Sequence, residues 1–596
     1  MGIQYVDGVR LYRSLTAGIQ RVIARQDYLN KINVFPVPDN DTGTNMAFTL
    51  SMIEDSVSDN VHSHIYHMST SIADAALDSA RGNSGAILAQ FLVGFSEGMQ
   101  DLKKITPKEF AKAAQEAKTS SYEALLKPQE GTILTVISDW ADALLHLSDH
   151  IHDFSTLMAK ALERAKISLE ETPQKLAVLA KAGVVDAGAQ GFVDLLEGIQ
   201  EFIDKGVLTR ANIEKVTDPS VSGKVEFNDT YQFCTECLVI NDPVDRIGIK
   251  EAIMDFGESI VIAGTKTKAK IHIHTDDPKK IMEICGQFGT VSGEKADDMF
   301  RQQADARQQH KEIVIIVDSG CDLSDDLIEK HNIHMVPVRL SFGEEHYVDK
   351  VTMSSDDFWQ ELAANPIHPK TSQPTPGDFR RQYQFLASHY ESAISIHLPA
   401  KLSGTMQSAL SAAKSVKDFP TKVIDSFSGS IGAGLIAIRA SEAVEAGKTF
   451  DEVIHIVNEA IKNTTIYISL DSLDNVVKGG RVSPGKKKIA DFLHINPILT
   501  FNENGVENIG VTIGKRNKVE KLIKFVEKRL PEDIPYRVGI SHALNKEGAK
   551  MIFDYFEPKI GNDNISITEI GPALGVHSGP GGAVIAIQYL EDSLHG

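Results

Sequence analysis

The sequence contains few cysteines, no long hydrophobic run and no recognisable export signal, and each absence excludes a class of protein. Four cysteines among 596 residues are too few for a disulfide framework, which favours a reducing compartment. The most apolar runs, such as IVIIV at 313–317, are much shorter than the ~20 residues that cross a bilayer. The first residues, MGIQYVDGVRLYRSL, lack the apolar stretch that secretion requires. These absences predict a soluble, cytoplasmic protein.

A surplus of basic residues is also missing. The chain has 61 Lys and Arg against 81 Asp and Glu, which gives a formal net charge of −20. Such a negative surplus repels phosphate backbones and argues against nucleic acid as a general partner. Hydrophobic residues at 42% and charged residues at 24% are ordinary for a globular protein. The length predicts about three or four domains.

Changes of pattern along the chain predict a multidomain protein with three parts. Residues 1–205 show helical periodicity throughout and predict an all-α domain. Residues 226–300 read as strand, helix, strand, which predicts a small α/β domain, followed by a charged helical connector at 294–312. Residues 312–596 alternate strands with helices and predict a larger α/β domain with a largely parallel sheet.

The segment NVFPVPDNDTGTNM carries the first candidate site. Asp39 and Asp41 lie two residues apart in a loop entered by proline, and two carboxylates this close repel each other unless a cation lies between them. Carboxylate oxygens suit Mg²⁺, which needs one or two of them beside waters and phosphates. The alternative is an Asx-turn that caps the next helix. The surrounding PVPDNDTGTN context favours the metal site.

Three glycine-containing turns also precede predicted helices in this domain. In the first, ARGNSGA, small side chains let backbone N–H groups approach a phosphate, and the following helix start favours negative charge. Taken alone, a tight helix–helix turn explains this motif better. KPQEGTILTV and GVVDAGAQGFV repeat the pattern, so together the turns predict a nucleotide site at one end of a helical bundle. The Walker A motif and the protein-kinase motifs are absent.

These four motifs, in this order, resemble the DhaL nucleotide-binding domain. That family supplies the ATP-binding subunit of dihydroxyacetone kinases and the kinase subunit of bacterial fatty acid kinase, and the FPVP flank is more similar to the second. The resemblance covers nearly all of residues 1–205 and implies an eight-helix antiparallel barrel that holds ATP through Mg²⁺. It implies catalytic metal ligands at Asp39 and Asp41, with Asn33 where the dihydroxyacetone branch has a further aspartate at another spacing. It also implies nucleotide contacts at Thr44, Asn45, Asn83, Ser84, Gly85, Thr132 and Gly188.

The middle region contains a candidate metal site. His272 and His274 are two residues apart on a predicted strand, so they face the same side and can share a metal ion. Cys234 and Cys237 are three apart and face opposite sides, so a strand presents one of them to that ion. The alternative is that these thiols are small core residues. FCTE and IHIHT resemble the middle domain of the fatty acid kinase subunit, which implies a metal set of Cys234, His272 and His274, with Zn²⁺ as the candidate ion.

In the C-terminal region, small polar residues gather in loops at the predicted strand ends, where open α/β sheets bind ligands. A nucleophile elbow of the G-x-S-x-G kind is absent, which argues against nucleophilic hydrolysis. The alternative is that each loop is only a turn. Hydroxyls and cations in these loops that could hold a carboxylate or phosphate belong to Thr371, Ser372, Ser403, Thr405, Arg481 and His577.

The ordered motifs DSGCDL, TSQPTPG, SGTMQSA, KGGRVS and GPALGVHSGPG resemble the DegV family of fatty acid-binding proteins, over about residues 312–596. The resemblance implies two α/β lobes that bury an acyl chain between them. By motif position, Thr371, Ser403 and His577 would contact the carboxyl head group, with Arg481 on the same face. Met406 stands where the family commonly has an aromatic residue.

The combined hypothesis is an ATP-dependent fatty acid kinase in which kinase and fatty acid carrier are fused. A carboxylate acceptor needs little more than positioning beside a charge-neutralised γ-phosphoryl group. Two alternatives stay open: a kinase of another small substrate such as dihydroxyacetone, and a non-enzymatic lipid-binding protein that senses nucleotide. The expected partners are ATP and a fatty acid, and the sequence leaves room for a homodimer and for transient membrane contact.

Overall fold

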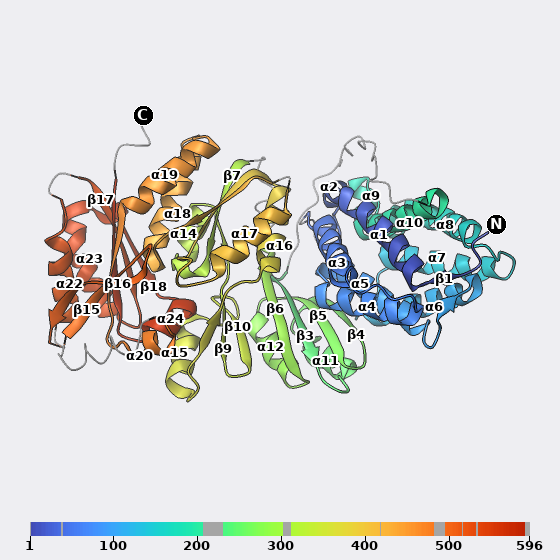
Figure 1. Ribbon diagram of the computed structural model, residues 1–596, viewed down its shortest axis with the longest axis horizontal. Helices are drawn as coiled ribbons and strands as arrows, with labels where there is room; N and C mark the ends of the chain where they lie inside the picture. Colours follow the sequence, from blue (N-terminus) through green and yellow to red (C-terminus); the bar gives the residue numbers. More distant parts are fainter. Residues whose placement is uncertain are drawn as a thin grey trace. The chain divides into compact units, whose positions relative to one another are not determined.

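The computed structural model describes residues 2–36, 38, 40–206, 230–301, 311–417, 419–481, 495–514, 517–531 and 534–590. Its internal contacts divide the chain into two compact units, Met1–Gln308 and Gln309–Gly596 (Figure 1). Each unit has hydrophobic cores of its own. Among the described residues, none of the helices combines the length and apolar character needed to cross a membrane.

Among the described residues of the first unit, eight long helices form a closed ring. Each packs against the next, and the last packs against the first, while the short helices α2 (Gln26–Lys31) and α9 (Ala177–Ala182) lie in connections. The predicted eight-helix barrel is therefore confirmed. In chain order the ring consists of α1 (Gly8–Ala24), α3 (Thr42–Val57), α4 (Ile65–Ser79), α5 (Gly82–Glu97), α6 (Pro107–Glu123), α7 (Ile133–Ser148), α8 (Phe154–Lys175) and α10 (Ala187–Lys205).

Aromatic side chains fill much of the barrel interior. Phe91 and Phe192 pack edge to face with ring centroids 5.4 Å apart, and Phe110 packs similarly on Trp140 at 6.3 Å. These rings also line a largely apolar cavity of about 320 Å³. Local signals set the helix ends: α6 begins with a capping box between Thr106 and Glu109 and with Pro107 at its first position.

A four-stranded antiparallel sheet follows in the same unit, in the order β4 (Glu258–Gly264), β5 (Lys268–Thr275), β3 (Phe233–Ile240) and β6 (Thr290–Asp298). Helices α11 (Arg246–Ile253) and α12 (Pro278–Gly286) pack with the apolar side chains of one face. This arrangement confirms the predicted small α/β domain.

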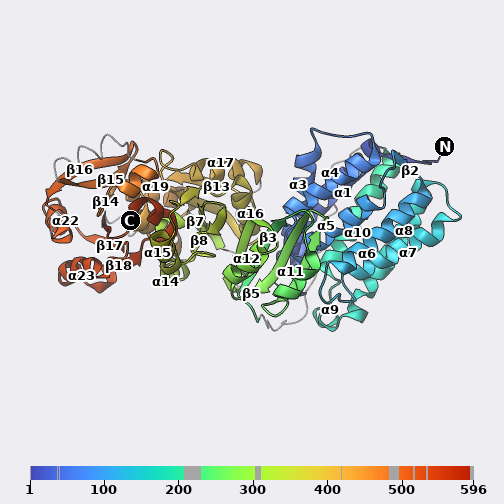
Figure 2. The same cartoon turned by 90° about the horizontal axis from the view of Figure 1, so that it is seen from below.

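The other face of the sheet packs on the barrel, beside α5 (Figure 2). Val261 and Ala263 of β4 join the hydrophobic core of the barrel. The backbone N–H of Ile262 donates to the carbonyl oxygen of Ala124 at 2.8 Å, and the Gly264 N–H donates to Gln90 Oε1 at 2.5 Å. Barrel and sheet therefore share one continuous interface.

The prediction of a helical connector from residue 294 is wrong, because residues 294–298 form the end of β6. Although the segment is rich in charged residues, Glu294 and Lys295 are buried. Lys295 forms an ion pair with Asp297 at 2.8 Å, so charge here is accommodated inside the sheet. Residues 302–310 of this predicted connector lie outside the described residues.

The second unit contains two α/β lobes. In the first, a parallel sheet has the order β13 (Thr421–Asp425), β12 (Tyr390–His397), β7 (Lys311–Asp318) and β8 (Ile333–Val336). Beside it is a small antiparallel sheet of β10 (Glu345–Val348), β9 (Arg339–Phe342) and β11 (Lys370–Ser372). Its helices are α14 (Asp325–Lys330), α15 (Ser355–Ala364), α16 (Pro376–Ala387) and α17 (Thr405–Ser415).

The second lobe has a six-stranded sheet in the order β16 (Gly505–Ile513), β15 (Ile495–Asn502), β14 (Thr464–Ser469), β19 (Ala583–Tyr589), β17 (Tyr536–His542) and β18 (Ile565–Glu569). The almost wholly buried helix α18 (Ser430–Glu445) contributes to a core shared by both lobes. The remaining helices are α19 (Phe450–Lys462), α20 (Asp474–Lys478), α22 (Lys518–Glu527), α23 (Lys546–Ile560) and α24 (Pro572–Ser578).

The predicted α/β class is confirmed for this unit, but the largely parallel sheet is confirmed for the first lobe alone. Within the described strands of the second lobe, β17 and β18 pair in parallel and the other pairs are antiparallel. A short turn joins β15 to β16, and so short a connection permits only antiparallel pairing. Alternation of strands and helices in the sequence does not reveal such reversals.

Candidate functional site

The first turns of α3, α5, α7 and α10 meet at one end of the barrel. A methyl group added at Gly188 would lie 2.8 Å from Ser84 Oγ and 3.5 Å from Ile133 Cβ, and one added at Gly82 would lie 2.5 Å from Asn45 Nδ2. Small residues therefore let four helix starts approach closely. Each start carries a partial positive charge of roughly half an electron, so this end of the barrel favours an anion.

At three of these helix starts the N-cap side chain makes no capping hydrogen bond, but other side chains accept from part of the first turn: Asn30 Oδ1 accepts from the Thr44 N–H at 3.0 Å and Glu236 Oε1 from the Gly82 N–H at 2.8 Å. Asp41, Arg81 and Thr132 occupy the N-cap positions of α3, α5 and α7 without a side-chain capping hydrogen bond. By contrast, Asp186 caps α10, accepting from the Ala189 N–H at 2.8 Å. Burial raises the pKa of Asp186 to about 6. Uncapped first-turn N–H groups are the donors that phosphate oxygens use.

A small pocket of about 40 Å³ opens at this end and brings barrel and sheet residues together. Eight of the residues predicted from sequence line it, five from the barrel and three from the sheet. Asp39 lies outside the described residues, so its position beside Asp41 stays a prediction. The lining consists of Asn33, Pro36, Asp41, Thr42, Asn45, Gly82, Asn83, Ser84, Cys234, His272, His274 and Asp297.

The other predicted nucleotide contacts lie behind this lining. Thr44 is buried against α2, where its hydroxyl accepts from Asn30 Nδ2 at 3.0 Å. Thr132 is also buried, at the start of α7. Gly85 and Gly188 provide the close packing that a side chain would prevent. In this structure these four residues shape the site without lining the pocket.

Oxygen ligands for a hard cation are present on the barrel side. Asp41 Oδ2 accepts a hydrogen bond from Asn45 Nδ2 at 2.7 Å, which orients the carboxylate. Asn33, 2% exposed, lines the same pocket. One or two carboxylates beside waters and phosphates suit Mg²⁺, so these residues fit a magnesium–nucleotide site.

The sheet side presents the Cys–His–His set. Cys234 on β3 lies directly opposite His274 on β5, and His272 follows on the same face, with the two imidazole centroids 5.2 Å apart. One ligand atom from each of the three lies within 4.8 Å of the others. Cys237 faces the opposite side and is buried in the core with Cys285, as the strand alternation predicts.

This set fits zinc on chemical grounds. One thiol and two imidazoles are ligands that Zn²⁺ accepts readily. His272 Nδ1 lies 3.2 Å from Glu236 Oε1 and 3.8 Å from Cys234 Sγ, while its Nε2 is buried and has no hydrogen-bond partner among the described residues. In a metal-ligating histidine, one ring nitrogen usually donates its N–H to a carboxylate and the other binds the metal ion.

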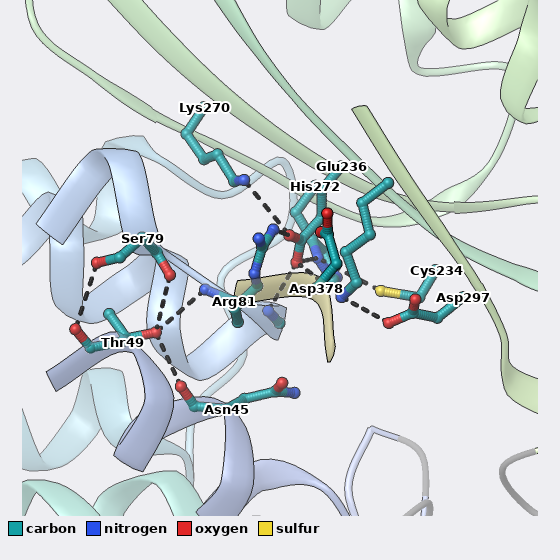
Figure 3. Close-up of polar contacts among 12 residues, drawn as sticks. Asn45, Thr49, Ser79, Arg81, Cys234, Glu236, Lys270, His272, Asp297 and Asp378 are labelled. Carbon is teal, nitrogen blue, oxygen red and sulfur yellow. Dashed lines mark hydrogen bonds and ion pairs between the residues drawn. The ribbon is translucent and has the colours of Figure 1, made fainter. Parts of the chain in front are cut away.

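Glu236 is the principal residue that the sequence reading did not single out. Figure 3 shows Arg81, Lys270 and His272 directed at its carboxylate. Arg81 Nη1 donates to Oε2 at 2.9 Å, and Lys270 and Lys295 lie 3.4 and 3.7 Å away. Burial alone would raise the pKa of Glu236, but Lys295, Lys270, His272 and Arg81 outweigh it and hold that pKa well below its usual range. Burial lowers the pKa of Lys270 to about 8.

The second unit brings together two of the residues predicted to hold a carboxylate, Thr371 and His577. Thr371 Oγ1 on β11 lies 3.2 Å from His577 Nε2 on α24. Burial, helped by Arg481 and His368, lowers the pKa of His577 to about 3, so its imidazole is neutral at pH 7. Ser372 follows Thr371 on β11 and is exposed. A hydroxyl and a neutral imidazole in contact can each donate a hydrogen bond to a carboxylate.

The remaining predicted contacts come from the loops after β12 and α20. α17 (Thr405–Ser415) begins at Thr405, and the Ser403 and Thr405 hydroxyls lie 2.8 Å apart. Arg481 donates from Nε and Nη2 to the Leu402 carbonyl oxygen at 3.3 and 3.2 Å, so its guanidinium lies beside this loop.

Buried acids hold the start of α24, which carries His577. Asp322 Oδ1 accepts from the Gly571 N–H at 2.9 Å, and Asp349 Oδ1 accepts from the Ala573 N–H at 3.2 Å. Burial raises the pKa of Asp322 to about 7 and that of Asp349 to about 6. The partners are more than 200 residues apart in sequence, which is why sequence reasoning missed Asp349.

Family models match three successive regions of the chain. Residues 36–201 match the DAK2 domain, residues 230–306 the FakA-like middle domain of fatty acid kinase, and residues 312–592 the DegV family. The chain therefore joins a DhaL-like DAK2 domain, a FakA-like middle domain and a DegV-family domain, which confirms the predicted fusion.

Similar proteins match parts of the chain. An uncharacterized protein of Staphylococcus saprophyticus is 32% identical over 355 residues, or 57% of this chain and 62% of its own length. One of Staphylococcus aureus strain USA300 is 32% identical over 324 residues, or 52% and 58%. The chain thus spans about three fifths of the length of these curated relatives.

Solved structures resemble part of the chain. A DegV-family protein of Thermus thermophilus, described as binding fatty acid, is 25% identical with a TM-score of 0.44, covering 47% of this chain and 100% of its own. DegV of Bacillus subtilis, described as a fatty acid-binding protein, is 26% identical with a TM-score of 0.44 and the same coverage.

Proposed function

We propose that this protein transfers the γ-phosphoryl group of ATP to the carboxylate of a fatty acid, which forms an acyl phosphate and ADP. The observation that carries the proposal is the pocket at the barrel end, which Asp41 and Asn45 line together with Gly82, Asn83 and Ser84 at the start of α5. The DAK2 match over the barrel and the DegV match over the second unit support a kinase and a carrier in one chain.

The barrel residues support nucleotide binding. We infer that the first turns of α3 and α5 bind the phosphates through backbone N–H groups, with Asn83 and Ser84 beside them. Asp39, Asp41 and Asn33 would hold Mg²⁺, which supplies neutralisation of the phosphate charge. The Cys234, His272 and His274 set would hold Zn²⁺ at the same pocket.

The second unit supports acceptor binding. We infer that Thr371, Ser403 and His577 hold the fatty acid carboxylate, since their donors are uncharged or weakly basic and leave its oxygens nucleophilic. Arg481 supplies a cation beside the same loop. A carboxylate oxygen attacks the γ-phosphorus, and the bond to the β–γ bridging oxygen breaks, so ADP leaves with the electron pair. Fusion sets the effective concentration of the two halves at roughly millimolar.

The test uses the full-length chain with Mg²⁺, ATP and either palmitate, oleate or dihydroxyacetone. ADP release and trapping of acyl phosphate by hydroxylamine are measured together. We expect both with a fatty acid, and a drop of about 100-fold or more in Asp41→Asn, because a charge-neutralising ligand is lost. Asp59→Asn is the matched control, since Asp59 is exposed and lies beyond the far end of α3.

Three outcomes would contradict the proposal. If dihydroxyacetone stimulates ADP release and fatty acid does not, the protein is a kinase of another substrate. Binding of ATP and fatty acid without ADP release would identify a nucleotide-sensing lipid-binding protein. Equal loss in both aspartate variants would show that Asp41 has no special place in the site.

A further inference from the structure

The carboxylate of Glu236 joins the two halves of the pocket at the barrel end. Oε1 accepts the backbone N–H of Gly82 at 2.8 Å, and Oε2 accepts Arg81 Nη1 at 2.9 Å, so both atoms reach the first turn of α5. The same Oε1 lies 3.2 Å from Nδ1 of His272. One side chain therefore contacts both the candidate phosphate-binding turn and the candidate metal set.

The strand register fixes this geometry. Glu236 lies directly opposite His272 on β5, and Cys234, two residues earlier on β3, lies opposite His274. When Glu236 accepts from Nδ1–H of His272, the Nε2 lone pair is left for a metal ion. That Nε2 atom is buried and has no hydrogen-bond partner in the described part of the chain.

Packing of the sheet against the barrel does not require the negative charge of Glu236. The interface already has apolar contacts from Val261 and Ala263 and a hydrogen bond from Gly264 to Gln90. Burying a carboxylate among cations stabilises a structure no better than well-packed apolar residues of similar volume. Because Glu236 is only 1% exposed and its charge adds no stability over apolar packing, we look for a role that depends on its two carboxylate oxygens.

We propose that Glu236 is a positioning residue that couples metal binding at Cys234, His272 and His274 to nucleotide binding at the first turn of α5. This inference rests on the nucleotide and metal parts of the proposed function. A metal ion that orders His272 fixes the Glu236 carboxylate, which in turn fixes Gly82 N and Arg81. By linkage, a bound nucleotide strengthens metal binding by the same factor.

Cobalt provides the first readout. The full-length chain is stripped of metal with a chelator and titrated with Co²⁺, whose thiolate and imidazole coordination gives visible and near-ultraviolet absorption bands. In Glu236→Gln we expect about 10- to 100-fold weaker Co²⁺ binding and an altered spectrum, because the carboxylate partner of His272 is lost. A merely structural ion pair would leave the cobalt spectrum unchanged.

Linkage is the second readout. The Kd of the β,γ-imido analogue of ATP with Mg²⁺ is measured with and without Co²⁺. We expect Co²⁺ to tighten analogue binding at least about fivefold in the wild type, and this ratio to fall to about one in Glu236→Gln. Gln90→Leu is the matched control, since it removes a buried contact at the same interface about 12 Å along α5 and should keep the wild-type ratio.

Glu236→Asp covers the case in which the glutamine variant fails to fold. It keeps the charge among Arg81, Lys270 and Lys295 but withdraws the carboxylate by about 1.5 Å, the length of one C–C bond. We expect the ratio of the analogue Kd without Co²⁺ to that with Co²⁺ to lie between the wild-type value and one. Wild-type cobalt spectrum, affinity and coupling in Glu236→Asp or Glu236→Gln would overturn the inference. If Co²⁺ does not change analogue binding in the wild type, the coupling role of Glu236 is overturned but the proposed function is not. If the wild type binds no analogue at all, the proposed function is overturned as well.

Discussion

Alanine at Gly82 tests whether the first turn of α5 controls the candidate nucleotide site. Gly82 is the first residue of α5, lines the pocket and has a φ of 60°, in the left-handed region. An added Cβ would lie 2.5 Å from Asn45 Nδ2, a distance that real Cβ atoms essentially never show. The substitution therefore imposes both a backbone cost and a displacement of Asn45.

The two costs can be estimated separately. A left-handed conformation costs an L-residue about 1–2 kcal/mol. Asn45 must move by about 1 Å to reach ordinary van der Waals contact, which breaks its 2.7 Å hydrogen bond to Asp41. A hydrogen bond to a charged group contributes roughly 1.5–3 kcal/mol. We therefore expect Gly82→Ala to lower the free energy of unfolding by about 2.5–5 kcal/mol.

Gly206 provides a control that isolates the backbone cost. It follows the last residue of α10 with a φ of 69°, and a Cβ there would meet nothing within 4 Å. Gly206→Ala should therefore cost about 1–2 kcal/mol, the conformational part alone. The difference between the two variants measures the displacement of Asn45.

The assay exploits the two tryptophans of the chain. Trp140 is buried in the barrel and Trp359 lies in the second unit, so in a Trp359→Phe background the fluorescence of Trp140 follows unfolding of the first unit in urea. Nucleotide affinity is measured alongside and should fall in Gly82→Ala but not in Gly206→Ala. Equal unfolding costs in the two variants, or unchanged nucleotide affinity in Gly82→Ala, would refute the reasoning.

Two further predictions concern His577 and Asp186. A Cβ at Gly479 would lie 2.1 Å from His577 Nδ1, so Gly479→Ala should push the imidazole away from Thr371. We expect the affinity for a fatty acid, measured by competition with a fluorescent fatty acid, to fall by about tenfold or more. Gly377→Ala, where a Cβ has room, should leave this affinity unchanged. The pKa of Asp186 is raised to about 6, so its stabilising contribution is present below about pH 4 and is lost as the pH rises through 6. The melting temperature of the wild type relative to Asp186→Asn should therefore fall between pH 3 and pH 7, by the equivalent of about 3 kcal/mol, and a pH-independent difference would contradict this.

Local patterns were sufficient to predict much of the fold and part of the site. Strand alternation placed His272 and His274 on one face and Cys237 on the other, and the structure confirms both. Alternation also assigns Glu236 to the face of Cys234, but nothing local marks it as important. Its partner Arg81 lies 155 residues earlier, and no periodic pattern reports such a contact.

The errors have a common physical origin. The end of β6 was predicted as a charged helical connector, yet residues 294–298 are part of a strand, in which Lys295 is buried beside Asp297 and Glu236. The strand directions of the second lobe depend on a hairpin between β15 and β16, which the alternation of strands and helices does not report. Composition and periodicity describe single elements, whereas these features depend on which elements pair.

The charges at the barrel end explain why the helix starts matter for the proposed function. The chain has a net charge of −20, so a bound nucleotide must be stabilised by local groups. The nearby cations Arg81, Lys270 and Lys295 already surround Glu236, which is buried with them. In the proposed function they hold the Glu236 carboxylate in place, and the backbone donors at the starts of α3 and α5, together with the metal ions, carry the phosphate charge. Changes at Glu236 should therefore affect nucleotide binding through geometry, which is what the cobalt-linked measurement detects.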